Sequence, residues 1–225
     1  PEIDPNYAHA WALIALGQML MRFATGGQGD DGLAAAERAL TLDSNLAEAH
    51  AIKARILSEG GRHDAASAEI EIALALDPES FEVNRAAAYL RFRQKRTKDA
   101  ILHFEKAQSL METDVSSGNM LMTCYTALGD SAAAQRQAQI TVARAQKALA
   151  QDPSNGAAMG FCCYALALLG QAESAKGWMS RALLIDPDNM NMRYNFACTL
   201  ATQLKDADGA IALLGPLFEK ISVGL

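Results

Sequence analysis

The feature that most constrains the fold is a 34-residue pattern that recurs along the chain. Its clearest copy is 47–80, where two segments with apolar residues at helical spacing flank Gly60-Gly61, and Asp77-Pro78 follows the second segment. This order predicts a helix, a tight turn and a second helix. Because one such hairpin cannot bury its apolar face alone, a fixed period in the thirties predicts stacked helical hairpins.

The pattern divides the sequence into six hairpins. Their expected bounds are 8–46, 47–80, 81–114, 115–155, 156–189 and 190–225. Residues 1–7 repeat the ending of a hairpin, which indicates a fragment that begins inside a longer array. The alternation of apolar and polar residues that is typical of strands is missing from the sequence. We therefore expect an all-α fold, a right-handed α-solenoid of about six helix-turn-helix repeats in a single array.

Two repeats are longer than the common period. The first exceeds it by five residues in the Gly-rich segment 24–29, which we expect to be a surface loop. The fourth exceeds it by seven residues before Asp152-Pro153. Seven residues are nearly two helical turns, so the second helix of this repeat keeps its apolar stripe. We expect that helix to run to Ala150 and to project from one edge of the array.

The small and apolar residues of these hairpins resemble those of the tetratricopeptide repeat. In 47–80, Ala66, Ile70, Ala73 and Pro78 match the places of that repeat on and after its second helix. The resemblance implies a non-catalytic interaction module that binds a peptide segment or a neighbouring domain. Such ligands lie along a concave groove that is lined by the first helix of each repeat.

A looser resemblance leads to an alternative function. The closing segment MRYNFACTLATQLKDADGAIALLGPLFEKI resembles C-terminal repeat regions of bacterial class III adenylate or guanylate cyclases. This resemblance covers no catalytic motif. It implies the regulatory or oligomerising C-terminal region of a larger enzyme, with no activity in this part of the polypeptide.

The groove positions that the resemblance implies lie on the first helix of each repeat. They are His9, Leu16, Met19, Glu48, Arg55, Glu59, Glu82, Arg85, Tyr89, Arg93, Asn119, Thr123, Thr126, Gly160, Tyr164, Asn191, Tyr194 and Cys198. The candidate peptide-binding residues among them are Arg55, Arg85, Tyr89, Arg93, Asn119, Tyr164 and Tyr194.

The repeat 81–114 is basic in an otherwise acidic protein. Arginine offers a planar fork of donors that suits carboxylates. One hypothesis is therefore an anion-accepting patch for an acidic segment or a polypeptide C-terminus, formed by Arg55, Arg85, Tyr89, Arg93 and Asn119. The alternative is that these are ordinary solvated helix residues that pair with Glu48, Glu59 and Glu82.

The sequence shows no pattern of catalytic or metal-binding residues. The four histidines are scattered, and no CxxC spacing joins the four cysteines, Cys124, Cys162, Cys163 and Cys198. We expect these thiols to be buried and reduced, because free cysteine in an apolar helix behaves as a small hydrophobe. Asp64 is expected to be an N-cap at the start of its helix. We assign no catalytic residue, no metal and no cofactor.

The net charge of −6 does not favour nucleic acid or an anionic membrane as a partner. The longest apolar stretch, 160–170, is shorter than the roughly 18 residues that span a bilayer. We expect a cytoplasmic protein whose partner is a protein or peptide. The last helix carries Ile211 and Phe218 on a second apolar face, which leaves a homodimer through the ends of the array as a further alternative.

Overall fold

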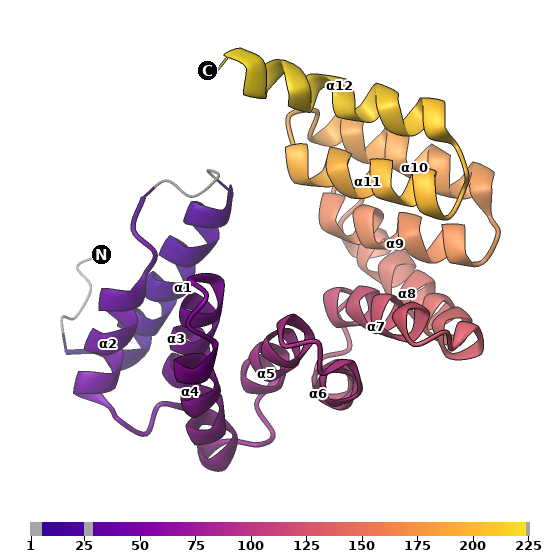
Figure 1. The fold of residues 1–225 in the computed structure, drawn as a ribbon. Coiled ribbons are helices and arrows are strands. Elements are labelled where there is room, and N and C mark those ends of the chain that lie inside the picture. Colours follow the sequence, from indigo (N-terminus) through magenta and orange to yellow (C-terminus); the bar gives the residue numbers. More distant parts are fainter. Residues whose placement is uncertain (1–5, 25–28, 224–225) are drawn as a thin grey trace. The chain divides into compact units, whose positions relative to one another are not determined.

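The computed structural model describes residues 6–24 and 29–223 (Figure 1). Within these ranges the protein forms twelve helices and no strand. The helices are α1 Ala8–Ala24, α2 Leu33–Leu42, α3 Ala47–Glu59, α4 His63–Leu76, α5 Phe81–Arg93, α6 Thr97–Leu110, α7 Ser116–Ala127, α8 Ser131–Gln151, α9 Gly156–Leu168, α10 Ala172–Ile185, α11 Met190–Thr202 and α12 Ala207–Val223. The all-α fold that the repeat pattern predicts is confirmed. Most of the expected loop at 24–29 lies outside the described residues.

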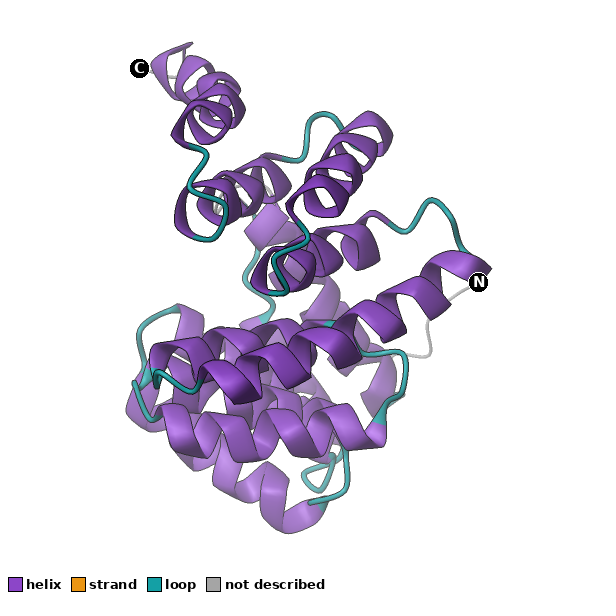
Figure 2. Cartoon of the chain, turned by 90° about the vertical axis from the view of Figure 1, so that its right-hand side faces the viewer, coloured by secondary structure: helices purple, strands orange, loops and turns teal. Residues whose placement is uncertain are grey.

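The helices belong to two compact units with three hairpins each. The first unit extends to Met111 and contains α1 to α6, and the second begins at Glu112 and contains α7 to α12. Within each unit, consecutive helices pack as hairpins that are joined by short loops (Figure 2). The assembly of all six hairpins into one right-handed array remains a prediction.

Small side chains at the helix contacts let the hairpins of each unit pack closely. In the first unit, Ala66 and Ile70 of α4 are buried against Ala86 of α5 in one core. In the second unit, Phe196 and Ala197 of α11 are buried in a core that also includes residues of α9 and α10. Each large apolar side chain that is buried stabilises the fold by about 1.5–3 kcal/mol. These cores therefore fix the first helix of each hairpin, which positions the residues described below.

Four hairpin turns share one backbone geometry although their sequences differ. Gly61, Gly129 and Gly170 have φ angles of 77°, 76° and 74°, and Lys95 adopts the same left-handed conformation with φ 60°. The residue after each donates its N–H to the carbonyl oxygen five residues earlier, over 2.8 to 3.0 Å. The third hairpin therefore closes like the second, fourth and fifth, without the glycine that this conformation favours.

Helix α8 has the expected extra length and ends one residue beyond Ala150, but it does not project from its unit. Its added turns bury Ala145 against Ala158 and Cys162 of α9. The guanidinium of Arg144 donates to the carbonyl oxygen of Asp114 over 3.1 Å. The expectation of a projecting helix is wrong, because the apolar stripe continues through the added turns and α9 covers it.

Side chains cap several helices, but not the one that the sequence suggested. Side chains that accept a backbone N–H at a helix start include those of Ser80 for α5, Asp114 for α7, Asp130 for α8, Asn155 for α9, Asn189 for α11 and Asp206 for α12. Helix α4 begins at His63, after Arg62, and has no side-chain cap among the described residues. Asp64 is therefore not an N-cap. It lies inside the first turn, where a carboxylate interacts favourably with the helix dipole.

Candidate functional site

Each unit contains a cavity whose walls come from the first helices of its three hairpins. The amide cavity of the second unit has a volume of about 400 Å³ and is lined by Asn119, Thr123, Gly156, Gly160, Phe161, Tyr164, Asn189, Asn191, Met192, Asn195, Phe196, Cys198, Thr199 and Thr202. The arginine cavity of the first unit has a volume of about 240 Å³ and is lined by Met19, Leu20, Arg55, Ser58, Glu59, Ala86, Tyr89, Leu90 and Arg93.

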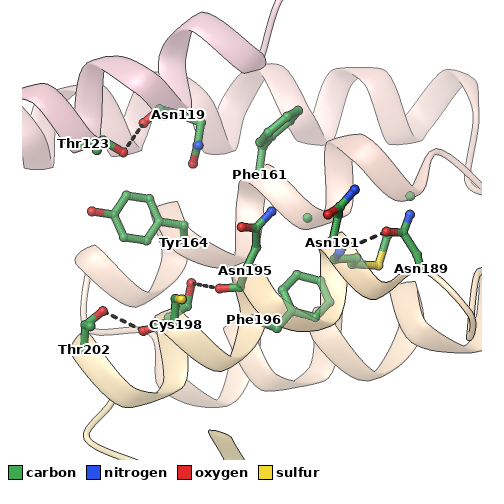
Figure 3. Close-up of a pocket in the computed structure, with 14 residues that line it drawn as sticks. Asn119, Thr123, Phe161, Tyr164, Asn189, Asn191, Asn195, Phe196, Cys198 and Thr202 are labelled. Carbon is green, nitrogen blue, oxygen red and sulfur yellow. Dashed lines mark hydrogen bonds between the residues drawn. The ribbon is translucent and has the colours of Figure 1, made fainter. Parts of the chain in front are cut away.

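The walls of the amide cavity combine carboxamides, hydroxyls and aromatic rings. Figure 3 shows Asn119 from α7, Tyr164 from α9 and Asn195 from α11 directed into the same space. None of the described residues that line this cavity is charged. A ligand there would be recognised by neutral hydrogen bonds and apolar contact instead of ion pairing.

Three carboxamides of the amide cavity retain their hydrogen-bonding capacity. Among the described residues, the side-chain amides of Asn119, Asn191 and Asn195 have no hydrogen-bond partner. Asn189 differs, because its Oδ1 accepts the N–H of Met192 over 2.9 Å and so caps α11. A carboxamide both donates and accepts. Three of the four amides can therefore bind polar groups of a ligand.

Two glycines of α9 keep the amide cavity open. A Cβ atom at Gly160 would lie 3.9 Å from Cε1 of Phe196, and one at Gly156 would lie 3.4 Å from Cε of Met192. A methyl group at position 160 would thus fit in ordinary van der Waals contact. A longer side chain there would extend into the space between the helices and fill part of the cavity.

The four thiols are not all buried, which corrects the expectation from the sequence. Cys124, Cys162 and Cys163 are buried, and burial raises the pKa of Cys124 to about 11 and that of Cys162 to about 12. Cys198 is exposed and lines the amide cavity. The reason is its position on α11, three residues after Asn195 and therefore on the same helix face.

The arginine cavity combines charges of both signs with apolar walls. Arg93 Nη2 lies 2.9 Å from Glu59 Oε1, and both residues line the cavity. Arg55 lines it too, but no acceptor among the described residues reaches its Nη1. Leucine and methionine side chains supply much of the remaining surface. The ion pair between Arg93 and Glu59 agrees with the alternative stated above, in which these arginines are ordinary helix residues that pair with nearby glutamates.

Arg85 stands outside the lining of the arginine cavity. Its Nη2 lies 2.6 Å from Glu82 Oε2, and its guanidinium carbon lies 5.2 Å from the centre of the Phe81 ring. Such a stacked arrangement adds a cation–π attraction. Arg85 therefore affects Arg55 through its charge, and its own carboxylate partner is Glu82.

Other kinds of site are missing from the described residues. No group of three or more His, Cys, Asp and Glu side chains lies close enough there to hold a metal ion. No helix there is long and apolar enough to cross a membrane.

Known sequences do not identify a family. No protein-family model matches the chain, and no curated protein matches it either. The looser resemblance to nucleotide cyclases therefore gains no support from these comparisons.

Solved structures resemble nearly the whole chain. The human IFIT1 dimer with m7Gppp-AAAA has a TM-score of 0.71 at 17% identity, over 98% of this chain and 52% of that one. PilF from Pseudomonas aeruginosa has a TM-score of 0.61 at 18% identity, over 95% of this chain and 92% of PilF. The Cut9–Hcn1 hetero-tetramer has a TM-score of 0.64 at 14% identity, over 94% of this chain and 41% of that one.

These neighbours are built from tetratricopeptide repeats. The chain has the tetratricopeptide-repeat fold. At identities below a fifth the likeness shows the fold alone, and the chain spans about half the length of IFIT1. Both cavities are lined by first helices of their hairpins.

Within the tetratricopeptide-repeat fold, the seven predicted binding residues divide between the two units. Three of them line the arginine cavity: Arg55, Tyr89 and Arg93. Asn119 and Tyr164 line the amide cavity, so the structure does not place Asn119 in one cavity with the arginines. Arg85 and Tyr194 line neither cavity. Tyr194 is 55% exposed, and its interaction with Cys198 raises the pKa of Tyr194.

Several lining residues were missed from the sequence. Asn195 and Phe161 line the amide cavity, and Ser58 lines the arginine cavity. The spacing of Asn191, Asn195 and Cys198 at i, i+4 and i+7 was the available signal, because it places all three on one helix face. Nothing comparable marks Ser58, whose place in a cavity depends on the packing of the neighbouring hairpins.

Proposed function

We propose that the protein is a non-catalytic module that binds a polypeptide, either a segment of another protein or a neighbouring domain, in the amide cavity. The observation that carries this proposal is the set of three carboxamides, Asn119, Asn191 and Asn195, that have no hydrogen-bond partner among the described residues. The tetratricopeptide-repeat fold supports it, because its first helices form the walls of the cavity.

The chemistry of the amide cavity suits an extended peptide. Every peptide group offers one N–H donor and one C=O acceptor, and a single carboxamide can bind both kinds of group. The rings of Phe161, Tyr164 and Phe196 and the thioether of Met192 offer apolar contact to the side chains between those groups. The volume of about 400 Å³ falls in the range of roughly 300–1,000 Å³ that is common for ligand pockets.

A polypeptide is favoured over a nucleic acid by the charge of the site. Binding of a phosphate backbone is driven by lysine and arginine side chains. The described lining of the amide cavity has neither, and the protein has a net charge of −6. The m7Gppp-AAAA ligand belongs to IFIT1, which shares only the fold with this protein.

A library of random 12-residue peptides displayed on phage tests the proposal. Peptides enriched on the wild-type protein are synthesised with a fluorescent label, and their affinities are measured by fluorescence polarisation. We expect Asn195→Ala to weaken binding about five- to tenfold, since each lost hydrogen bond to a neutral group contributes roughly 1 kcal/mol. Gly160→Leu is expected to abolish binding, because the added side chain occupies the cavity.

Gly160→Ala is the matched control for the leucine variant. Its methyl group would lie in ordinary contact with Phe196, and alanine favours a helix over glycine by roughly 1 kcal/mol. This variant is expected to be as stable as the wild type or more so, and to bind peptides with nearly unchanged affinity. Failure to enrich any peptide, or enriched peptides that bind Gly160→Leu like the wild type, would refute the amide cavity as the binding site.

A second candidate function is self-association, as an oligomerising region of a larger protein. The observation that favours it is the exposure of Ile211 and Phe218 on α12, at 67% and 65%. Light scattering during size exclusion would show a mass that rises with concentration, and the double variant Ile211→Glu and Phe218→Glu would remain monomeric. A wild-type protein that is monomeric at all concentrations excludes this candidate.

A further inference from the structure

The first helix of the chain exposes an apolar face that its counterparts bury. Counted from the start of its helix, Leu13 is the sixth residue of α1, as Ile52 is of α3 and Ala86 is of α5. Ile52 and Ala86 are buried in the cores that join each of these helices to the hairpin before it, whereas Leu13 is 67% exposed. The face with which a first helix binds a preceding hairpin is therefore exposed on α1.

The tenth residue of these helices shows the same difference. Ile56 of α3 and Leu90 of α5 are buried in the same two cores. The tenth residue of α1 is Gly17, and a Cβ atom there would meet open space among the described residues. Leu20, three residues further along on the same side of the helix, is exposed as well. The open face of α1 therefore has two leucines, Leu13 and Leu20, with a notch between them.

Second helices have a corresponding face, with which they contact the hairpin that follows. The fifth residue of α4 is Ser67, whose Oγ accepts a hydrogen bond from Gln94 Nε2 over 2.8 Å. The fifth residue of α10 is Lys176, whose Nζ lies 2.6 Å from Asp206 Oδ2. Gln94 and Asp206 both belong to the following hairpin, so this position contacts the next hairpin in both units.

On α12 the same positions are apolar and exposed. Its fifth residue is Ile211, its ninth is Gly215 and its twelfth is Phe218. Ile211 and Phe218 are exposed, and a Cβ atom at Gly215 would meet open space among the described residues. The twelfth residue of α4 is Leu74, which packs against the core that α4 shares with α5. The exposed face of α12 is therefore the one that a following hairpin would cover.

We infer that α12 of one copy of the protein binds α1 of a second copy, in the way that α4 binds α5 within the chain. Both faces have a large apolar residue, a glycine four residues later and a second large apolar residue three residues after the glycine. A glycine leaves a hole between the large side chains of its face, and large side chains of a facing helix pack into such holes. The two faces therefore match in spacing and in shape.

The register of the α4–α5 contact shows which side chains would meet. Ser67 contacts Gln94, the fourteenth residue counted from the start of α5. The fourteenth residue of α1 is Met21, which is exposed. In the same register Ile211 of one copy would therefore contact Met21 of the next. An apolar pair would replace the polar pair of the internal contact, and burial of both side chains would favour association.

The charges at the helix ends agree with an antiparallel arrangement. Arg22 lies in the last turn of α1 and Asp208 in the first turn of α12, and both are exposed. In an antiparallel pair these two residues lie at the same end, where opposite charges attract each other and help to set the orientation of the partners. A parallel pair would place them at opposite ends.

This contact joins two different surfaces, so each copy has one of each kind. Association through such a contact continues beyond a dimer unless the copies close into a ring. One face each of two 17-residue helices is a small interface, so we expect association to be weak. The inference rests on self-association, the second candidate function, and adds the surface to which α12 binds.

Complementation between two variants tests the contact by sedimentation velocity. The α1 variant carries Leu13→Glu and Leu20→Glu, and the α12 variant carries Ile211→Glu and Phe218→Glu. The wild type should exceed the mass of a dimer between about 5 and about 500 µM, a range that covers weak specific interfaces. Each variant alone should remain monomeric. Their equimolar mixture should form a dimer and nothing larger, because only one pair of faces is intact.

The double variant Leu102→Glu and Leu184→Glu is the matched control. It adds the same two charges at exposed leucines of α6 and α10, away from both faces, and should associate like the wild type. A dimer that forms only in the mixture also shows that the α1 variant and the α12 variant are folded.

The remaining outcomes overturn the inference and separate it from self-association in general. If the α1 variant alone associates like the wild type, α12 binds a surface other than α1, so self-association stands and the inference fails. If the wild type is monomeric at every concentration, both fail. A wild type that associates, together with a mixture that stays monomeric, also overturns the inference. Peptide binding in the amide cavity is measured separately and depends on none of these results.

Discussion

The amide cavity and the arginine cavity have the same frame and different chemistry. Both are lined by the first helices of three consecutive hairpins. The described lining of the amide cavity is uncharged and offers three unused carboxamides. In the arginine cavity, Nη1 of Arg55 and the hydroxyl of Ser58 lack partners among the described residues. The repeat pattern sets the place of each cavity between the first helices. The side chains outside that pattern set which chemical groups each cavity offers to a ligand.

A buried phenylalanine lies next to each cavity, but on a different helix of its hairpin. Phe104 of α6 is fully buried and meets Tyr89 edge-on, with ring centres 5.2 Å apart. Phe196 of α11 is buried and itself lines the amide cavity. One large aromatic residue supports each cavity, in the first unit from the second helix of a hairpin and in the second unit from the first helix.

The largest expected effect is on the stability of the separate units. Phe104→Ala should destabilise the first unit by about 3–5 kcal/mol, because it leaves a cavity in a close-packed core. Phe196→Ala should do the same in the second unit. Trp11 lies in the first unit and Trp178 in the second, so variants that keep only one of them report each unit by fluorescence during urea unfolding.

The control for this prediction is the reporter in the unaltered unit. Phe104→Ala should shift the Trp11 transition to lower urea and leave the Trp178 transition in place, and Phe196→Ala should do the reverse. If both reporters shift together in either variant, the two units unfold as one. The two cavities would then not belong to independently stable units.

The second prediction uses the exposed thiol of the amide cavity as a probe. Cys198 should react with Ellman's reagent at pH 8 at least about a hundredfold faster than Cys124 or Cys162, because burial keeps those two thiols protonated. A peptide bound in the amide cavity should slow the fast reaction. A fast phase that survives Cys198→Ser would contradict the assignment.

The hairpin frame was predictable from sequence because it depends on local signals. In 47–80, Gly61 takes the left-handed turn that ends α3, and Asp77 follows the last residue of α4. The same turn at Lys95 was readable only from the register of its neighbours, since lysine gives no signal for it. The path of α8 was not predictable, because an apolar stripe does not reveal which helix will cover it.

The candidate sites were predictable only in part, because they depend on the packing between helices as well as on helical register. Helical register placed Arg55, Tyr89 and Arg93 on first helices, and the structure brings these three into one cavity. Register could not show that Glu59 pairs with Arg93 and leaves Arg55 without an acceptor among the described residues, because that depends on how α3 packs on α5. The exposure of Cys198 likewise depends on the open space over α11.

The third prediction compares one turn position in the two units. Lys95 in the first unit and Gly129 in the second adopt the same left-handed backbone, with φ 60° and 76°. Lys95→Gly should stabilise the first unit by about 1 kcal/mol, because a side chain is strained in this conformation. Gly129→Lys should cost the second unit a similar amount. Urea unfolding measures both, and Lys98→Gly, inside α6, is the control that should destabilise instead.

The smallest expected effect concerns pH and is confined to the first unit. Burial raises the pKa of Glu69, but hydrogen bonds from Lys53 and His50 outweigh it, so the pKa lies below its ordinary value. The contacts are 2.8 Å to Lys53 Nζ and 2.6 Å to His50 Nδ1. Since the folded pKa is depressed, this contribution to stability is present above the unfolded pKa of about 4.3 and is lost as the pH falls through the folded value.

Glu69→Gln should therefore destabilise the first unit at pH 7 by about 0.5–1 kcal/mol, and should reduce the loss of stability between pH 5 and pH 3. The Trp11 reporter measures both quantities by urea unfolding at each pH. Glu79→Gln is the matched control, because Glu79 pairs with Lys106 at an exposed position and its loss should change little. If the Trp178 transition responds to Glu69→Gln as strongly as the Trp11 transition, the charge network of α3 and α4 is not confined to the unit that holds the arginine cavity.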